Sequence, residues 1–204
     1  MLLIVISPPE TYSDEHKTLT ILFNQGLEIF HLRKPDYSYD DMETYITSIP
    51  VEFHPRIVIH SHYLLANRYN LKGIHLTEKA RKDKNIGKVL KTLGNKSLSA
   101  SFHHLDELKR NRRRYDYVFL SPVFDSISKS GYKSNFDLST IRKDIQLINT
   151  HHKHPLNIIA LGGINAENIG LIKKTGFAGA ALLGAVWESD DPLSTFSAVK
   201  NHFL

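Results

Sequence analysis

The chain has 204 residues, a formal net charge of +5 and no cysteine. The absence of cysteine excludes a disulfide scaffold, a cysteine-ligated metal centre and thiol catalysis. A hydrophobic content of 41% with 23% charged residues is typical of a globular protein and excludes a disordered chain.

No apolar run of the sequence reaches the roughly 20 residues that a membrane-spanning helix needs. The first apolar stretch, Leu2–Ser7, is also too short for the core of a signal peptide and has no basic residues before it. We therefore expect a cytoplasmic protein. The basic clusters Lys79–Lys84 and Lys109–Arg114 are interpreted as solvated surface, so neither nucleic acid nor a membrane is an expected partner.

Short apolar runs alternate with longer amphipathic stretches along the whole chain. The runs are rich in Ile, Val, Leu and Phe, and most lack strict alternation of apolar and polar residues, which is typical of strands buried on both faces. The predicted strands are Leu2–Ser7, Gly26–Leu32, Arg56–His60, Gly73–Leu76, Ser97–Ser101, Tyr117–Leu120, Asn157–Leu161 and Ala178–Leu183.

Helical patterns lie between these runs. We expect Asn165 to cap a helix that begins at Ala166, and Asp191 to cap one that begins at Pro192. The predicted helices are Glu15–Asn24, Tyr39–Ile49, Leu105–Arg113, Leu138–Thr150, Ala166–Lys174 and Pro192–His202.

The alternation of eight strand and helix units predicts an α/β fold. Eight units favour a single (β/α)₈ TIM barrel that occupies residues 1–204 as one domain. A doubly wound open sheet has the same alternation and is the alternative.

Glycines follow the last two predicted strands. In a (β/α)₈ barrel, functional residues lie on the loops after the strands, and phosphate is often bound by the loops after the seventh and eighth. Gly162 and Gly163 follow the seventh run, and Gly184 follows the eighth. Because glycine lets backbone N–H groups approach an anion, we predict a phosphate site here, with a simple tight turn as the alternative.

The loop after the sixth run mixes hydroxyl groups with cations, among them Ser126, Ser128 and Lys129. Such groups suit the oxygens of a phosphate or pyrophosphate, and Arg33 would face them across the barrel mouth. A polar surface loop without a ligand is the alternative.

Four of the twelve histidines, His31, His60, His75 and His103, lie at or just beyond predicted strand ends. Histidine in this place can act as a general acid or base near neutral pH. The spacing of His60 and His62 also puts two imidazoles on one face of an extended segment, which is a weaker indication of a metal site because no carboxylate accompanies the pair.

The order of these motifs resembles the thiamine-phosphate synthase and TenI family of small (β/α)₈ barrels. The resemblance runs from about Gly26 to Trp187. The segments that carry it are Phe30–Arg33, Gly73–Leu76, Asp116–Val118, Pro122–Phe124 with Lys129, and Ala160–Ile164.

The resemblance implies a site for a thiazole phosphate, which the family's synthases couple to an aminopyrimidine pyrophosphate with the help of Mg²⁺. It places Ser126, Ile127, Ser128, Gly163, Leu183 and Gly184 around the thiazole phosphate. It places Arg33, Ser101 and Lys129 at the pyrophosphate and the pyrimidine. Where the synthases have a further lysine this chain has Pro35, and Lys34 is the expected partial substitute.

Two departures from the synthase pattern concern the metal. The positions of the Mg²⁺-binding carboxylates hold Ser61 and Ala80, which cannot supply the charge that Mg²⁺ requires. The resemblance is therefore closer to the TenI branch, whose thiazole tautomerases need neither metal nor pyrophosphate. The histidine that this branch has before Val123 is replaced by Pro122, which cannot transfer a proton.

We therefore predict a TenI-like thiazole tautomerase without a cofactor, which uses His31, and with it His60 or His103, as proton carriers. The first alternative is a divergent synthase that holds Mg²⁺ through Glu78 or Asp83 with the histidines. The second is a non-catalytic binder of thiazole or thiamine phosphate, and the third is a histidine-ligated metal hydrolase. In each of the first three cases the partner is a small phosphate-bearing molecule, and a homodimer is compatible with all of them.

Overall fold

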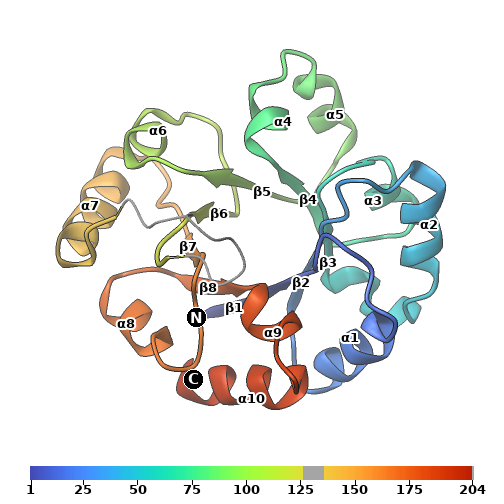
Figure 1. Cartoon of the computed structure of the whole chain (residues 1–204). Coiled ribbons are helices and arrows are strands. Elements are labelled where there is room, and N and C mark those ends of the chain that lie inside the picture. Colours follow the sequence, from blue (N-terminus) through green and yellow to red (C-terminus); the bar gives the residue numbers. More distant parts are fainter. Residues whose placement is uncertain (126–135, 204) are drawn as a thin grey trace.

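A closed parallel barrel forms the centre of the molecule (Figure 1). The computed structural model describes residues 1–125 and 136–203. Each strand pairs with its neighbours in chain order, and β1 closes the ring by pairing with β8, with Leu2 opposite Gly179. The strands are β1 (Leu2–Ile6), β2 (Ile29–Leu32), β3 (Ile57–Ile59), β4 (Gly73–Leu76), β5 (Ser97–Phe102), β6 (Tyr117–Leu120), β7 (Ile158–Leu161) and β8 (Gly179–Leu182). This closure confirms the (β/α)₈ barrel and excludes the open sheet.

Helices surround the barrel in the described part of the chain (Figure 1). They are α1 (Glu15–Asn24), α2 (Tyr39–Thr47), the 3₁₀ helix η1 (Val51–Arg56), α3 (Leu65–Arg68), α4 (Glu78–Lys82), α5 (Ile86–Thr92), α6 (Leu105–Arg110), α7 (Leu138–His151), α8 (Ile169–Lys174), α9 (Gly184–Trp187) and α10 (Pro192–Phe203). Within the described residues, no helix is long and apolar enough to cross a membrane.

Two predicted helix starts have different outcomes. Helix α10 begins at Pro192, and the Asp191 carboxylate accepts a hydrogen bond from the Ser194 N–H at 3.0 Å, as the sequence predicts. The predicted start at Ala166 is wrong, because α8 begins at Ile169. The Asn165 side chain instead accepts from the N–H groups of Glu167 and Asn168, at 3.0 and 3.1 Å, and closes a turn before the helix.

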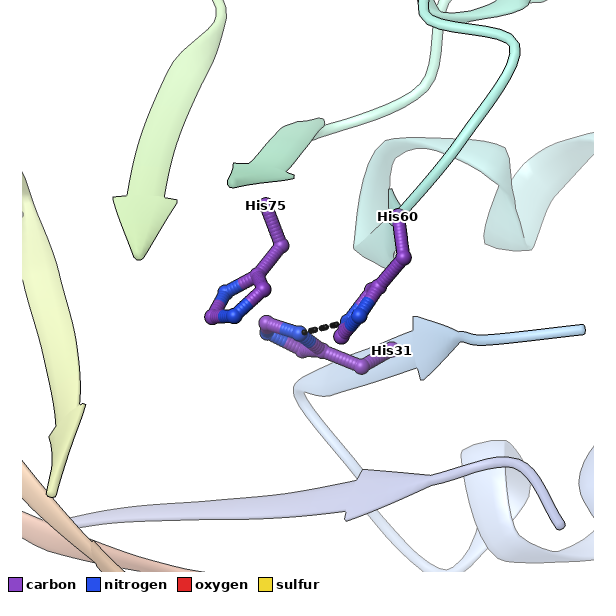
Figure 2. A group of neighbouring side chains, drawn as sticks. All are labelled: His31, His60 and His75. Atoms are coloured by element: carbon purple, nitrogen blue, oxygen red, sulfur yellow. Dashed lines mark hydrogen bonds between the residues drawn. The ribbon is translucent and has the colours of Figure 1, made fainter. Parts of the chain in front are cut away.

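The barrel interior holds a small apolar cluster with a polar layer above it. Because strand residues alternate between two faces, Ile29 and His31 both point inward, as do Tyr117 and Phe119. His31, His60 and His75 come from β2, the end of β3 and β4 and meet inside the ring (Figure 2). Each of these three apolar strands therefore places a histidine at or near its carboxyl end, where functional residues of this fold are expected.

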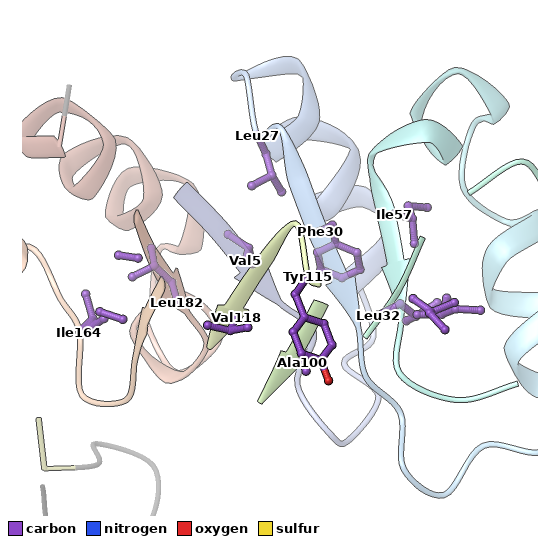
Figure 3. Packing of buried hydrophobic residues seen from close by; sticks show 14 of the residues in the cluster. Val5, Leu27, Phe30, Leu32, Ile57, Ala100, Tyr115, Val118, Ile164 and Leu182 are labelled. Carbon is purple, nitrogen blue, oxygen red and sulfur yellow. The ribbon is translucent and has the colours of Figure 1, made fainter. Parts of the chain in front are cut away.

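The larger apolar cluster lies between the barrel and its helices. Residues of the opposite strand face, such as Val5, Phe30 and Val118, pack outward against helix residues (Figure 3). Leu19 and Leu22 of α1, a helix that the sequence predicts with the same bounds, are fully buried in this cluster. This layer fixes the positions of the strands and so of the loops that follow them.

Candidate active site at the carboxyl end of the barrel

A cavity of about 550 Å³ opens where the strands end. Residues that follow each of the eight strands line it, as expected for the functional face of this fold. Most of the predicted site residues are among its lining: Arg33, His60, Ser101, His103, Gly162, Gly163, Leu183 and Gly184. The predicted residues Ser126, Ile127, Ser128 and Lys129 lie outside the described residues.

The loop after β7 requires glycine at two positions. Gly162 and Gly163 have φ angles of +100° and +63°, in the left-handed region. A Cβ atom on Gly163 would lie 2.2 Å from the carbonyl oxygen of Asp125. No larger residue fits there without moving the backbone, so this loop passes close to the chain that follows β6 and leaves main-chain groups on the cavity wall.

Arg33 and Lys34 are neighbours in sequence with opposite surroundings. The Ser7 hydroxyl accepts from the backbone N–H of Arg33 at 2.7 Å and donates to its carbonyl oxygen at 3.0 Å, which fixes the backbone beside the cavity. Arg33 lines the cavity and is half-buried. Its fixed charge and its fork of donors suit the oxygens of an anion.

Lys34 does not line the cavity, which corrects the prediction that it binds the substrate. Its side chain is fully buried, and its Nζ lies 2.6 Å from the Glu15 carboxylate and 2.6 Å from the carbonyl oxygen of Glu10. The Tyr45 hydroxyl donates to the other oxygen of Glu15 at 2.6 Å. Lys34 therefore joins α1 and α2 to the strand end, and its fully buried side chain does not reach a ligand in the cavity.

The rings of the three inward histidines contact one another, and His31 is hydrogen-bonded to His60 (Figure 2). His31 Nδ1 lies 2.9 Å from His60 Nε2, and His31 Nε2 lies 2.6 Å from the hydroxyl of Tyr117. His31 is fully buried, so it reaches the cavity only through His60. The prediction that His31 itself acts on a ligand therefore requires an intermediary.

Burial keeps these imidazoles neutral. Desolvation lowers the pKa of His31 and of His60 well below the ordinary value, and the other histidines of the group add to the effect. Desolvation, followed by the charge of Arg33, lowers the pKa of His75 to about 3. At neutral pH each ring thus carries one N–H group and one free lone pair.

The remaining predicted histidines lie at the edge of the site. His103 lines the cavity, with Nδ1 3.0 Å from the carbonyl oxygen of Ser121 and Nε2 3.9 Å from the Glu78 carboxylate. The predicted pairing of His60 with His62 is wrong. His62 has a positive φ of 50°, and its Nε2 lies 2.9 Å from the carbonyl oxygen of Tyr37, outside the barrel interior.

A sequence model of the family described as thiamine monophosphate synthase matches residues 2–186, most of the barrel. The chain belongs to this family. It is 27% identical to a thiamine-phosphate synthase of Lysinibacillus sphaericus over 86% of this chain and 82% of that protein. It is 26% identical to the thiamine-phosphate synthase of Flavobacterium psychrophilum over 92% of this chain and 91% of that protein.

Two solved structures show the same architecture. A thiamine phosphate pyrophosphorylase from Bacteroides thetaiotaomicron superposes with a TM-score of 0.76 and is 34% identical, with 100% of this chain and 94% of that one covered. One from Pyrococcus furiosus has a TM-score of 0.79 at 18% identity, covering 99% and 95%, and supports the fold alone.

The family resemblance implies Mg²⁺, and the described residues do not fit the expected site. Ser61 and Ala80 stand where carboxylates are expected, and neither lines the cavity. Glu78 does line it, with one oxygen bonded to Lys82, whereas Asp83 does not line it. Since Mg²⁺ is held by hard oxygen ligands that carry charge, this donor set is too poor for the expected pair of carboxylates.

Two residues of the histidine group were not predicted from the sequence, Ser99 and Tyr117. Ser99 Oγ lies 2.9 Å from His75 Nδ1, and Ser101 Oγ lies 2.8 Å from His75 Nε2. A signal for Ser99 exists in the sequence, because serines at 97, 99 and 101 alternate with apolar residues and mark one face of the strand. Tyr117 carries no such signal, since it lies in an apolar run.

Proposed function

We propose that this chain transfers an aminopyrimidinylmethyl group, the pyrimidine ring with its methylene carbon, from its pyrophosphate ester to the ring nitrogen of a thiazole phosphate. The product is thiamine phosphate. The bond between the methylene carbon and the pyrophosphate oxygen breaks, a carbon–nitrogen bond forms, and pyrophosphate leaves with the electron pair. Support comes from the family match and from relatives of this name that the chain covers almost completely. The observation that carries the proposal is one cavity that contains both the Arg33 guanidinium and the glycines after β7 and β8.

In this reaction each of the two anionic groups is bound by different residues of the cavity. Backbone N–H groups near Gly163 and Gly184 bind the thiazole phosphate, while Arg33 binds the pyrophosphate and offsets the charge that develops as it leaves. Ser101 and His60, which also line the cavity, offer neutral polar groups to the pyrimidine. A half-enclosed site strengthens each of these contacts relative to water.

A coupling assay tests this function. Purified protein is incubated with thiazole phosphate and aminopyrimidine pyrophosphate, with and without Mg²⁺, and thiamine phosphate and pyrophosphate are quantified. The proposal expects both products in equal amounts. Absence of product under both conditions, with thiazole phosphate still bound, overturns it.

The Arg33→Gln variant sharpens the assay. Loss of a charge-assisted contact worth about 1.5–3 kcal/mol predicts a reduction of kcat/KM for the pyrophosphate substrate by roughly 10- to 100-fold. The matched control is Arg68→Gln, since Arg68 lies on α3 outside the cavity lining and pairs with Glu43 at 2.8 Å. Equal losses in the two variants contradict a role for Arg33 at the pyrophosphate.

The histidine group favours a second candidate function, a proton shift within a thiazole phosphate carboxylate. His60 lines the cavity, is neutral and has a nitrogen, Nδ1, with no hydrogen-bond partner among the described residues. A neutral imidazole of this kind is suited to general acid/base catalysis. Incorporation of deuterium from solvent into the thiazole compound, followed by NMR without added metal, tests this candidate, and its absence overturns it.

A further inference from the structure

The imidazole of His75 spans two serines of the neighbouring strand. Its Nδ1 lies 2.9 Å from the Ser99 Oγ, and its Nε2 lies 2.8 Å from the Ser101 Oγ. Strands β4 and β5 are parallel with His75 opposite Ser99, and Ser101 follows on the same face about 7 Å further along the strand. One ring therefore bridges a serine inside the barrel and a serine at the cavity.

The two serines have different surroundings. Ser99 is fully buried and does not line the cavity, whereas Ser101 is half-buried and lines it. The Ser99 Oγ has a second neighbour, the carbonyl oxygen of Ile74 at 3.4 Å, to which it can donate. Among the described residues, the Ser101 Oγ is bonded to His75 alone. The group thus has a closed end at Ile74 and an open end at the cavity.

The arrangement of the rings does not suit a metal ion. The three inward histidines place one ligand atom each within 4.8 Å of one another. However, the rings of His60 and His75 are stacked, with centroids 4.3 Å apart and planes 23° from parallel. Imidazole lone pairs lie in the plane of the ring, so stacked rings do not aim at one ion. Figure 2 shows both nitrogens of His75 turned away from His60, and both are bonded to serines.

The protons of this group have two arrangements. Burial, followed by the charge of Arg33, lowers the pKa of His75 to about 3, so the ring is neutral, with one N–H group and one lone pair. With the proton on Nδ1, His75 donates to Ser99, and Ser99 donates to the carbonyl oxygen of Ile74. Ser101 then donates to Nε2, so three hydrogen bonds form. With the proton on Nε2, Ser99 donates to Nδ1 and His75 donates to Ser101, and only two form. The first arrangement is favoured because it contains one more hydrogen bond.

We propose that His75 and Ser99 are positioning residues that fix Ser101 as a hydrogen-bond acceptor toward the ligand. In the favoured arrangement the hydroxyl hydrogen of Ser101 points to His75, and only oxygen lone pairs face the cavity. A ligand gains by offering an N–H group at this wall and loses by offering a carbonyl oxygen, which would meet a second acceptor.

The inference deepens the proposed function and rests on it for the substrate class. The group that Ser101 selects is the exocyclic amine of the aminopyrimidine, in preference to the oxygen of an oxopyrimidine. The selection is made by two residues that do not line the cavity, His75 and Ser99. Their hydrogen bonds decide which way the one hydroxyl at the cavity points.

Ser99 is the residue that tests this polarity, because it is buried away from the cavity. Removal of its hydroxyl in Ser99→Ala leaves a buried Nδ1–H group of His75 without an acceptor, which is less well tolerated than a lone pair without a donor. The proton of His75 therefore moves to Nε2, and Ser101 turns its own hydrogen to the cavity. A substitution two hydrogen bonds away from the ligand thus inverts the group that the ligand meets.

The first measurement is the binding of two probes by isothermal titration calorimetry, without the thiazole phosphate. Aminopyrimidine pyrophosphate and the oxopyrimidine pyrophosphate of the same shape are compared, and the ratio of their Kd values gives the preference for the amine. We expect Ser99→Ala to reduce this preference by about 3- to 10-fold, the effect of one neutral hydrogen bond. The matched control is Ser97→Ala on the same face of β5, which leaves the preference unchanged because the Ser97 Oγ donates to the Asp116 carboxylate at 3.1 Å.

The second measurement locates the proton directly. In protein with ¹⁵N-labelled histidine, the ring nitrogen shifts report which nitrogen carries the proton, and the His75→Gln variant identifies the signals of His75. We expect the Nδ1–H form in the unaltered protein and in Ser97→Ala, and the Nε2–H form in Ser99→Ala. A role of Ser99 in packing alone would not move this proton.

The outcomes separate the inference from the proposed function. An Nε2–H form of His75 in the unaltered protein overturns the inference, and so does a Ser99→Ala variant that weakens both probes equally. Loss of the preference for the amine together with the change of tautomer supports it. If neither probe binds, it is the proposed function that fails, and the tautomer of His75 still decides the polarity of Ser101.

Discussion

Two buried polar networks flank the end of β2, only three residues apart along the chain, and they are built on opposite principles. The network of Lys34 contains two full charges, Lys34 and Glu15, in contact at 2.6 Å with no exposed side-chain surface. The network of His31 contains only neutral groups, and one end of it, His60, lines a cavity. The difference teaches that burial alone does not identify a functional group. A network of paired charges shut off from the cavity holds the structure, whereas a neutral network with an unpartnered nitrogen, on a residue that lines the cavity, is a candidate for chemistry.

The largest expected effect comes from breaking the charged network. Lys34→Met leaves the buried Glu15 carboxylate without its counter-ion, and we expect the free energy of unfolding to fall by about 3–5 kcal/mol. Urea denaturation measures this change. The double variant Lys34→Met/Glu15→Leu removes both charges and should recover most of the loss, and Lys17→Met, in an exposed pair, should show no change. Similar stability of the single and double variants contradicts the comparison.

The two networks also contain matched tyrosines. Tyr45 donates to a carboxylate at 2.6 Å, and Tyr117 is bonded at 2.6 Å to a neutral imidazole. Because hydrogen bonds to charged groups are the stronger ones, Tyr45→Phe should cost about 2 kcal/mol of unfolding free energy and Tyr117→Phe about 1 kcal/mol. Denaturant midpoints of the two variants decide this. The reverse order is evidence that the histidine network carries a charge.

The change per pH unit is the most gradual of the expected effects, and it concerns the neutral network. The pKa values of its histidines are lowered on folding, that of His75 to about 3. Unfolded histidine binds a proton near pH 6.5, so the stability from these rings is complete above that pH and is lost as pH falls toward 3. His75→Gln should reduce the slope of unfolding free energy by about 1.4 kcal/mol per pH unit between pH 6 and 4. His202→Gln, an exposed control on α10, should leave the slope unchanged.

The fold could be predicted from the sequence because each strand is a compact apolar run. The bounds of β4 and β6 agree with the predicted runs to the residue. Helices α3, α4, α5 and α9 have only four to seven residues each, too short to show a helical period, and were not predicted. The start of α8 was misplaced because the side chain of Asn165 has the same hydrogen-bonding ability in a turn as in a helix cap.

Site residues could be predicted from the sequence only where their position directly after a strand is enough to place them at the cavity. Arg33 and the glycines after β7 and β8 follow from that rule and line the cavity. The burial of Lys34 could not be foreseen, because it depends on Glu15 of a helix packed against the barrel. The bonds of Tyr117 to His31 and of Ser99 to His75 depend on how far each strand is staggered against its neighbours, as where His75 stands opposite Ser99, and composition does not contain that information.

The pairing that closes the barrel has a consequence for biosynthesis. The indole N–H of Trp187 donates to the carbonyl oxygen of Ile6 at 2.7 Å, a contact between positions 181 apart in the chain. Strand β1 likewise pairs with β8, at the other end of the chain. It therefore leaves the ribosome long before β8 is made, and one edge of β1 stays unpaired during most of translation. Such an edge is a site for pairing with other chains. Cellular yield should therefore depend on how long the nascent chain waits, and so on translation speed and chaperones as well as on final stability.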